Sequence, residues 1–226
     1  MNVLILGATG MVGQGVLREC LLDPAIQSVH TLGRTPVETE SPKLHQIVHP
    51  DLTNLAPISS KLTGFDACFF CIGVTAVGMP EDDYRRLTYD LTLSVARTLV
   101  ALNPSMTFIY ISGAGTDSTQ RSSAKWARIK GETENALLRL PFKAAYMFRP
   151  GYIQPMHGIK ARIWWYNAVY AVFGPLYPLW TRLAPNRLTT TEAVARAMLT
   201  AAKYGAPKPI LETPDINALG HPAALN

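Results

Sequence analysis

Cysteine is scarce in this sequence, and no linker-like segment divides it. Only Cys20, Cys68 and Cys71 occur among the 226 residues. Three is an odd number and too few for a disulfide framework, so we expect a reducing compartment. No Gly/Ser-rich stretch or charge run interrupts the chain, which predicts one domain over residues 1–226. These features exclude a small, disulfide-stapled secreted module.

The amino-terminal segment lacks the basic residues that begin a secretion signal. "MNVLILGATG" runs straight into a strand-like apolar stretch. Together with the low cysteine content, this predicts a cytoplasmic protein.

The positive charge of the chain is not concentrated in any one segment. The formal net charge is +5 and the isoelectric point is about 9.2, but the Lys and Arg residues are scattered. Nucleic-acid-binding proteins carry clustered basic stripes, so no nucleic-acid partner is expected. A few of these cations could meet the phosphates of a small cofactor, and a generally basic surface is the alternative.

The sequence offers no pattern of metal ligands. No His/Cys/Asp/Glu cluster has zinc or iron spacing, and no two histidines stand at i, i+4, so no metal site is predicted. "CFFC" has the spacing of a redox motif, but Cys68 and Cys71 lie in a predicted strand and face opposite sides of it. Both are interpreted as buried packing residues.

Apolar runs alternate with longer helical patterns along the first 150 residues. Helices are expected over 11–22, 82–102 and 124–140, with a later helix over 190–205. Strands are expected over 2–6, 28–33, 44–48, 66–72, 107–112 and 144–148, with a last strand over 209–212. Strands buried on both faces and joined by helices predict an α/β fold with a doubly wound parallel sheet, the Rossmann architecture.

A glycine-rich turn follows the first expected strand. "LILGATGMVGQG" places Gly7, Gly10 and Gly13 between that strand and a helix. The first glycine permits a tight turn, the second lets the backbone approach a pyrophosphate, and the third lets the helix pack close to the sheet. The helix N-terminus then offers free N–H groups to phosphates. Dinucleotide binding is predicted here, and Thr9, Met11 and Val12 belong to the same candidate site.

The residue after the second expected strand indicates which dinucleotide binds. An acidic residue there would accept from a free ribose 2′-hydroxyl, whereas Arg34 would bind a 2′-phosphate through charge-assisted bonds. Arg34 therefore favours NADP over NAD, with Thr35 as an additional hydroxyl. A solvated loop arginine is the alternative.

Five motifs occur in the order found in one known superfamily. They are "GATGMVG", "HPDLTN", "FFCIG", "YISGAG" and "FRPGYIQP". With them, residues 1–212 resemble the short-chain dehydrogenase/reductase superfamily. The similarity is greatest to its compact atypical, NAD(P)H-binding and epimerase-like members, including Tat-interactive-protein-like oxidoreductases.

The resemblance implies a set of cofactor contacts. Asp51 and Leu52 would flank the adenine, and Cys71 and Gly73 would lie along the ribose and pyrophosphate. The nicotinamide side would be lined by Pro150, Gly151 and Tyr152.

The resemblance also implies a catalytic serine, a tyrosine, and a lysine four residues after the tyrosine. Ser112 and Lys130 match, but Trp126 stands in the tyrosine position. An indole N–H donates but does not ionise at useful pH, so Trp126 cannot shuttle a proton. We expect Lys130 to bind the cofactor ribose and Ser112 to bind a substrate oxygen. Trp126 is a packing residue or a stacking platform, and Tyr152 and His157 are candidate replacement acids.

Two functions follow from these residues. The first is an NADP-dependent oxidoreductase or epimerase-like enzyme acting on a small, apolar carbonyl or alcohol. The second is a non-catalytic NADP(H)-binding sensor or assembly partner, since Trp126 removes the proton donor.

An aromatic-rich segment within residues 151–190 is expected to form a small cap on the substrate side. Residues 163–181 contain no charge, but Gly174, Pro175 and Pro178 interrupt the run, which argues against a membrane span. A substrate-pocket wall is the first interpretation. Peripheral membrane contact and a homodimer contact are the alternatives.

Overall fold

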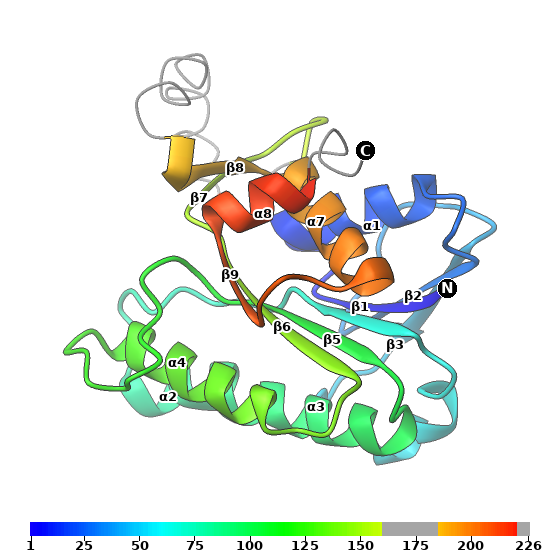
Figure 1. Ribbon diagram of the computed structural model, residues 1–226. Helices are drawn as coiled ribbons and strands as arrows, with labels where there is room; N and C mark the ends of the chain where they lie inside the picture. The colour runs from blue at the N-terminus through cyan, green and yellow to red at the C-terminus, as the bar shows by residue number, and fades with distance from the viewer. Residues whose placement is uncertain (160–184, 221–226) are drawn as a thin grey trace.

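The protein is organised around one parallel β-sheet, seen in a computed structural model that describes residues 1–159 and 185–220. The seven strands of this sheet lie in the order β3-β2-β1-β4-β5-β6-β9 (Figure 1). Their bounds are β1 Asn2–Leu6, β2 Ser28–Gly33, β3 Leu44–Val48, β4 Ala67–Phe70, β5 Thr107–Ile111, β6 Ala144–Arg149 and β9 Ile210–Glu212. All their pairings are parallel, so the predicted doubly wound sheet is confirmed.

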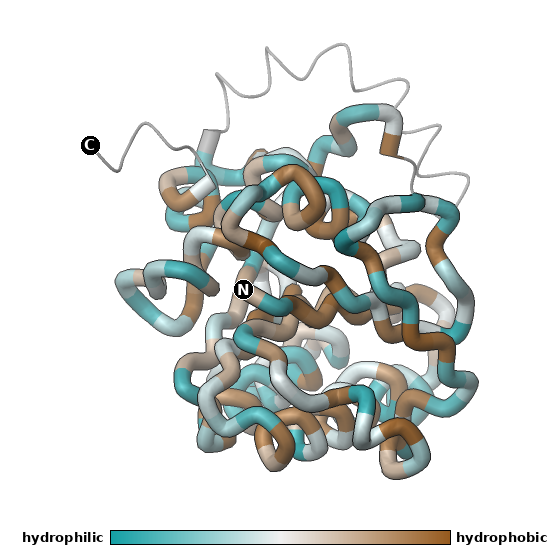
Figure 2. Tube along the Cα trace, turned by 90° about the vertical axis from the view of Figure 1, so that its right-hand side faces the viewer, coloured by the Kyte–Doolittle hydropathy of each residue, from teal (hydrophilic) through white to brown (hydrophobic). Residues whose placement is uncertain are grey.

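Helices cover both faces of this sheet. On one face lie α1 (Met11–Leu22), α7 (Thr191–Tyr204) and α8 (Thr213–Gly220), and on the other lie α2 (Glu81–Arg85), α3 (Leu91–Leu102) and α4 (Lys125–Leu138) (Figure 1). The central strand β1 is buried on both sides: Val3 and Ile5 pack with α1 and α7, while Leu4 and Leu6 pack with α3. This explains the unbroken apolar runs, which form the brown centre of the trace in Figure 2.

The predicted helix over 82–102 is interrupted in the structure. Between α2 and α3 the chain forms a π-helical turn, η2 (Arg86–Asp90). The apolar spacing continues across this turn, so the sequence pattern does not reveal the extra residue that a π-turn inserts.

Three short elements near the carboxyl end were not predicted. They are α8 and two strands, β7 (Tyr152–Gln154) and β8 (Leu188–Thr190). The two strands pair in parallel and form a separate two-stranded sheet. Strands of three residues are too short to show a period-two pattern. The strands lie within the expected cap, whereas the aromatic segment 163–181 lies outside the described residues. Among the helices that the structure describes, none has the length and apolar character to cross a bilayer.

The two cysteines of "CFFC" lie on opposite sides of the sheet, as predicted. Cys68 is buried with Leu4 and Leu6, whereas Cys71 is half-buried and packs against the opposite core. Burial raises the pKa of the Cys71 thiol to about 12, so it remains protonated and unreactive near neutrality.

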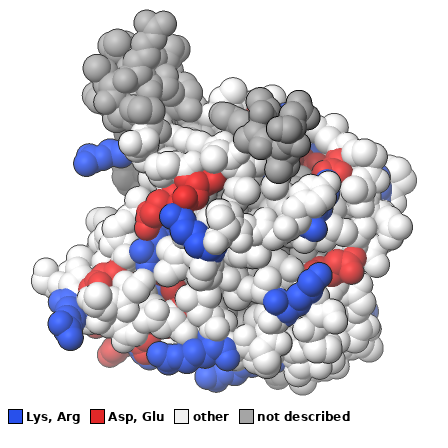
Figure 3. Space-filling view, in the orientation of Figure 1, with Lys and Arg blue, Asp and Glu red and all other residues white. Residues whose placement is uncertain are grey.

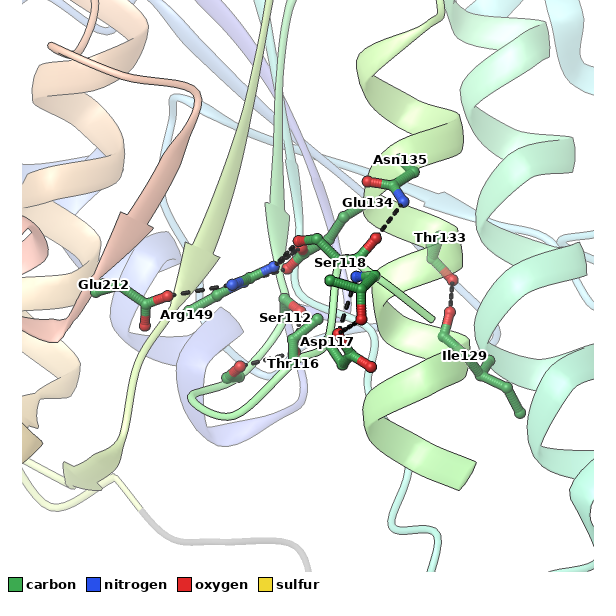
Figure 4. Close-up of polar contacts among 12 residues, drawn as sticks. Ser112, Thr116, Asp117, Ser118, Ile129, Thr133, Glu134, Asn135, Arg149 and Glu212 are labelled. Atoms are coloured by element: carbon green, nitrogen blue, oxygen red, sulfur yellow. Dashed lines mark hydrogen bonds and ion pairs between the residues drawn. The ribbon is translucent and has the colours of Figure 1, made fainter. Parts of the chain in front are cut away.

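A buried ion pair links α4 to the sheet. Glu134, on α4, has no exposed surface, and Arg149, at the end of β6, is 9% exposed. The Arg149 guanidinium donates to both Glu134 carboxylate oxygens, to Ser118 Oγ and to Glu212 (Figure 4). One side chain thus connects α4, β6, β9 and the loop that follows β5.

Removing the acidic partner of this pair should be costly. We expect Glu134→Ala to lower the free energy of unfolding by about 3 kcal/mol. The substitution leaves the buried Arg149 guanidinium bonded only to Ser118 and Glu212. Glu132→Ala on the same helix is the matched control. It breaks the more exposed Arg85–Glu132 pair and should cost at most about 1 kcal/mol. Urea unfolding would contradict this account if the two variants lost equal stability.

Candidate cofactor and active site

The glycine-rich turn brings three backbone segments into direct contact. Gly7 has φ +80°, and its carbonyl accepts from the Gly10 N–H at 2.9 Å. A Cβ at Gly7 would lie 2.7 Å from the carbonyl carbon of Cys71, and a Cβ at Gly13 would lie 2.1 Å from the Gly7 carbonyl oxygen. Neither position has room for a side chain. The first turn of α1 therefore packs directly against the backbone of the glycine turn.

The first turn of α1 keeps its backbone donors available. Gly10 is the N-cap residue and supplies no side chain, and the first turn contains no acidic residue. The Gln14 N–H donates to the Gly10 carbonyl at 2.8 Å, so the N–H groups of Met11, Val12 and Gly13 precede the first α-helical hydrogen bond. Thr9 contributes its carbonyl, which accepts from Gln14 Nε2 at 3.1 Å. A helix end of this kind favours an anion.

Arg34 and Thr35 are exposed and follow β2 directly. Among the described residues, the Arg34 guanidinium has no hydrogen bond or ion pair. Near this end of the sheet, a pocket of about 470 Å³ lies between α1 and the segment after Thr35. Its lining includes Thr9, Gln14, Arg18, Val37, Glu38 and Thr39, whereas Arg34 is not part of it.

The residues expected beside the adenine and ribose differ in how they are placed. The Asp51 carboxylate accepts from the Thr53 hydroxyl at 2.6 Å and from the Thr53 N–H at 2.8 Å, and these bonds lower the pKa of Asp51. Leu52 is buried in the core, so its side chain points away from solvent. Gly73 is exposed, and a Cβ there would meet no atom within 4 Å. Gly73 therefore leaves open space, whereas Leu52 could offer a ligand only its backbone.

Ser112 and Lys130 meet at the end of β5. Ser112 is 8% exposed, and its N–H donates to the Phe148 carbonyl at 2.8 Å. The Lys130 ammonium donates to the Ser112 backbone carbonyl at 3.0 Å and lies 5.5 Å from the centre of the Tyr110 ring. The sequence analysis placed these two residues in one site. It did not predict that the lysine would bond to the backbone carbonyl of the serine.

Trp126 lies one helical turn before Lys130 and is half-buried. Its indole ring rests against Gly115, because a Cβ there would lie 3.2 Å from the ring. The indole N–H has no hydrogen-bond partner in the described part of the chain. Trp126 thus packs on the loop after β5 and keeps one donor.

The residues expected on the nicotinamide side lead into strand β7 and are hydrogen-bonded to other segments. The Pro150 carbonyl accepts from the Ala114 N–H, and the Gly151 N–H donates to Thr213 Oγ1, both at 2.9 Å. The Tyr152 hydroxyl donates to Gln154 at 3.0 Å, and His157 bonds Glu192 at 2.7 Å. Both candidate replacement acids are therefore held by other side chains.

Thr116 is a polar residue of this region that sequence reasoning missed. It is 6% exposed, and its hydroxyl lies 2.9 Å from Ser112 Oγ. A threonine in a loop carries no signal of such a contact. Among the described residues, no three or more His, Cys, Asp or Glu side chains gather where they could hold a metal ion.

The chain is similar in sequence to fungal proteins. No protein-family model matches it. "Protein fmp52, mitochondrial" of Emericella nidulans is 33% identical over 159 residues, which are 67% of this chain and 66% of that protein. The match thus spans just under two thirds of that relative. "Protein FMP52, mitochondrial" of Chaetomium globosum is 27% identical over 231 residues, covering 96% of each chain.

Solved structures resemble this chain over most of its length. MoeE5 in complex with UDP-glucose and NAD gives a TM-score of 0.65 at 15% identity, covering 93% of this chain and 75% of MoeE5. A short chain dehydrogenases/reductase from Saccharomyces cerevisiae gives 0.65 at 13% identity, covering 99% and 97%. The chain shares the Rossmann-like α/β fold of these structures. This similarity confirms the predicted Rossmann architecture. Because the sequence identities are only 15% and 13%, it supports the fold and not a function.

The expected cytoplasmic location is contradicted by the sequence relatives of this chain, which are named mitochondrial proteins. A low cysteine content distinguishes reducing from oxidising surroundings. It does not distinguish one reducing compartment from another, and this is why the prediction was wrong.

The ionisation of Lys130 should make stability depend on pH. Burial lowers the pKa of Lys130 from 10.5 to about 8, and Glu134 opposes part of this effect. Between these two values the unfolded chain binds the proton that the folded chain has lost, so stability rises with pH.

Lys130→Met should remove this dependence. We expect wild type to gain stability relative to Lys130→Met when urea unfolding is moved from about pH 7 to about pH 9.5. Lys61→Met, at an exposed position, is the control and should follow wild type. A constant difference between wild type and Lys130→Met over this range would refute the lowered pKa.

Proposed function

We propose that this chain binds NADP(H) and acts as an oxidoreductase on a small, apolar carbonyl or alcohol. The observation that carries the proposal is the uncapped N-terminus of α1 above the glycine turn, with Arg34 exposed after β2. These groups fit a pyrophosphate and a 2′-phosphate. The fold neighbour MoeE5 was solved with NAD, which supports a nicotinamide nucleotide as ligand.

The preference for NADP rests on charge. Arg34 has a guanidinium without a partner among the described residues, and no acidic side chain stands beside it in sequence at positions 33 or 35. On the face shown in Figure 3, Lys and Arg lie in small groups interspersed with Asp and Glu. A phosphate would gain charge-assisted bonds from Arg34 that a free hydroxyl would not.

The residues of the active site have distinct roles in this proposal. The bound cofactor would supply or accept a hydride, and the proton that balances this transfer would be exchanged with water. Lys130 would bind the ribose and raise the positive potential at the site, and Ser112 would bind the substrate oxygen. The indole N–H of Trp126 would donate to that oxygen without giving up its proton. The compact chain also suits the atypical, epimerase-like members that its motifs resemble.

The role of Arg34 predicts a selective loss of affinity. We expect Arg34→Ala to weaken NADPH binding by roughly 10- to 100-fold, the value of a charge-assisted bond, and to leave NADH binding unchanged. Isothermal calorimetry measures both. Arg139→Ala is the control, since Arg139 is exposed at the far end of α4 from Trp126 and Lys130. Equal losses for NADPH and NADH would rule out a 2′-phosphate contact.

Trp126 favours a second candidate, a non-catalytic NADP(H)-binding protein. A site that only binds the cofactor needs no residue to exchange a proton with substrate. Here the tyrosine position holds an indole, and Tyr152 and His157 are engaged by Gln154 and Glu192. Cofactor binding would then order a surface for another macromolecule.

Restoring the phenol separates the two candidates. If the chain is an enzyme, Trp126→Tyr should raise NADPH oxidation with a panel of small ketones and aldehydes by roughly 100-fold, the usual contribution of a positioned acid. Trp126→Phe, which removes the indole without adding an acid, should not. No oxidation by wild type or Trp126→Tyr, with NADPH still bound, would favour the binding protein.

A further inference from the structure

Ser112 has each of its polar groups fixed by the protein. Its backbone N–H and carbonyl are bonded to Phe148 and Lys130, as described above. Its hydroxyl is directed at Thr116, four residues later, and Figure 4 shows the two side chains next to each other at the turn after β5. The direction of this last hydrogen bond determines what Ser112 can offer a ligand.

Thr116 settles which hydroxyl donates. Thr116 Oγ1 lies 2.7 Å from the Gly113 carbonyl oxygen, and a carbonyl can only accept. The single hydroxyl hydrogen of Thr116 therefore points at Gly113. Toward Ser112, Thr116 Oγ1 can only accept, so the Ser112 hydrogen points at Thr116. The hydrogen bonds run from Ser112 to Thr116 to Gly113 in a region almost closed to water.

We propose that Thr116 is a positioning residue that keeps Ser112 as a hydrogen-bond acceptor, so that the site binds a substrate hydroxyl in preference to a carbonyl. The inference rests on the proposed function and narrows the substrate class from carbonyls and alcohols to alcohols, as long as the hydrogen bond from Ser112 to Thr116 is in place. An alcohol donates to the free lone pairs of Ser112 without disturbing the chain of bonds. A carbonyl oxygen can be bound by Ser112 only if its hydroxyl turns away from Thr116.

This rotation has a measurable consequence. When the Ser112 hydroxyl turns away, the buried Thr116 Oγ1 no longer receives a hydrogen bond. The loss of one hydrogen bond should weaken the binding of a carbonyl ligand by roughly fivefold. Thr116→Val removes the acceptor at nearly constant shape and frees the Ser112 hydroxyl to donate. Thr116→Ser keeps the hydroxyl and should keep the preference.

The test uses two inert probes on the protein loaded with NADP⁺. 1-Methylcyclohexanol has no hydrogen on its carbinol carbon to transfer, and cyclohexanone cannot be reduced by the oxidised cofactor. Ligand-observed NMR titration gives the ratio of their dissociation constants. We expect wild type and Thr116→Ser to favour the alcohol, and Thr116→Val to shift the ratio toward the ketone by roughly fivefold. Ser112→Ala should lose the preference, and it serves as a second variant if Thr116→Val does not fold.

The outcomes separate this inference from the proposed function. An unchanged ratio in Thr116→Val, an equal shift in Thr116→Ser, or a wild-type complex that binds neither probe would overturn the role of Thr116 while NADP⁺ binding stands. Calorimetry with NADP⁺ is run on every variant. A wild-type protein that does not bind NADP⁺ would contradict the proposed function and this inference together.

Discussion

The turn from β1 into α1 has no room for a side chain, and the candidate cofactor site depends on this close approach. Gly7 lies against the end of β4, and Gly13 lies against the carbonyl of Gly7. Because the backbones touch, α1 begins directly at the edge of the sheet, and the N–H groups of Met11, Val12 and Gly13 precede its first α-helical hydrogen bond. A larger residue at either position would move the helix end, and with it the positive end of the helix dipole.

The other half of the site depends on how the loop after β5 is held. The Asp117 carboxylate accepts from the N–H groups of Thr119, Arg121 and Ser122 and from the Thr119 hydroxyl, and these bonds lower its pKa to about 2. Its backbone carbonyl leaves no space for a Cβ at Gly131 of α4. Ser118 joins the same loop to the buried Arg149–Glu134 pair (Figure 4). Ser112 and Thr116 are therefore held by a loop with little freedom to move.

The sheet was predictable because each strand carries its own signal. The strands of the sheet were each predicted with bounds close to those observed, since buried parallel strands form short apolar runs between turns. Patterns that span too few residues were missed, such as β7 and β8, and so was the π-turn at Arg86–Asp90, which leaves the apolar spacing intact. The pairing of Ser112 with Lys130 came from motif order, whereas the contact of Thr116 with Ser112 left no trace in the sequence.

The sequence by itself determined the α/β fold and the glycine turn, because local geometry and residue chemistry decide these features. That Trp126 stands where a tyrosine is expected came only from the resemblance of its motifs to a known superfamily. Only the tertiary structure decided which donors are occupied. Tyr152 and His157 look like free acids in the sequence, yet each is bonded to a neighbour, and the hydroxyl of Ser112 is committed to Thr116. The reason is that a hydrogen bond depends on distance and direction between side chains, and packing sets both.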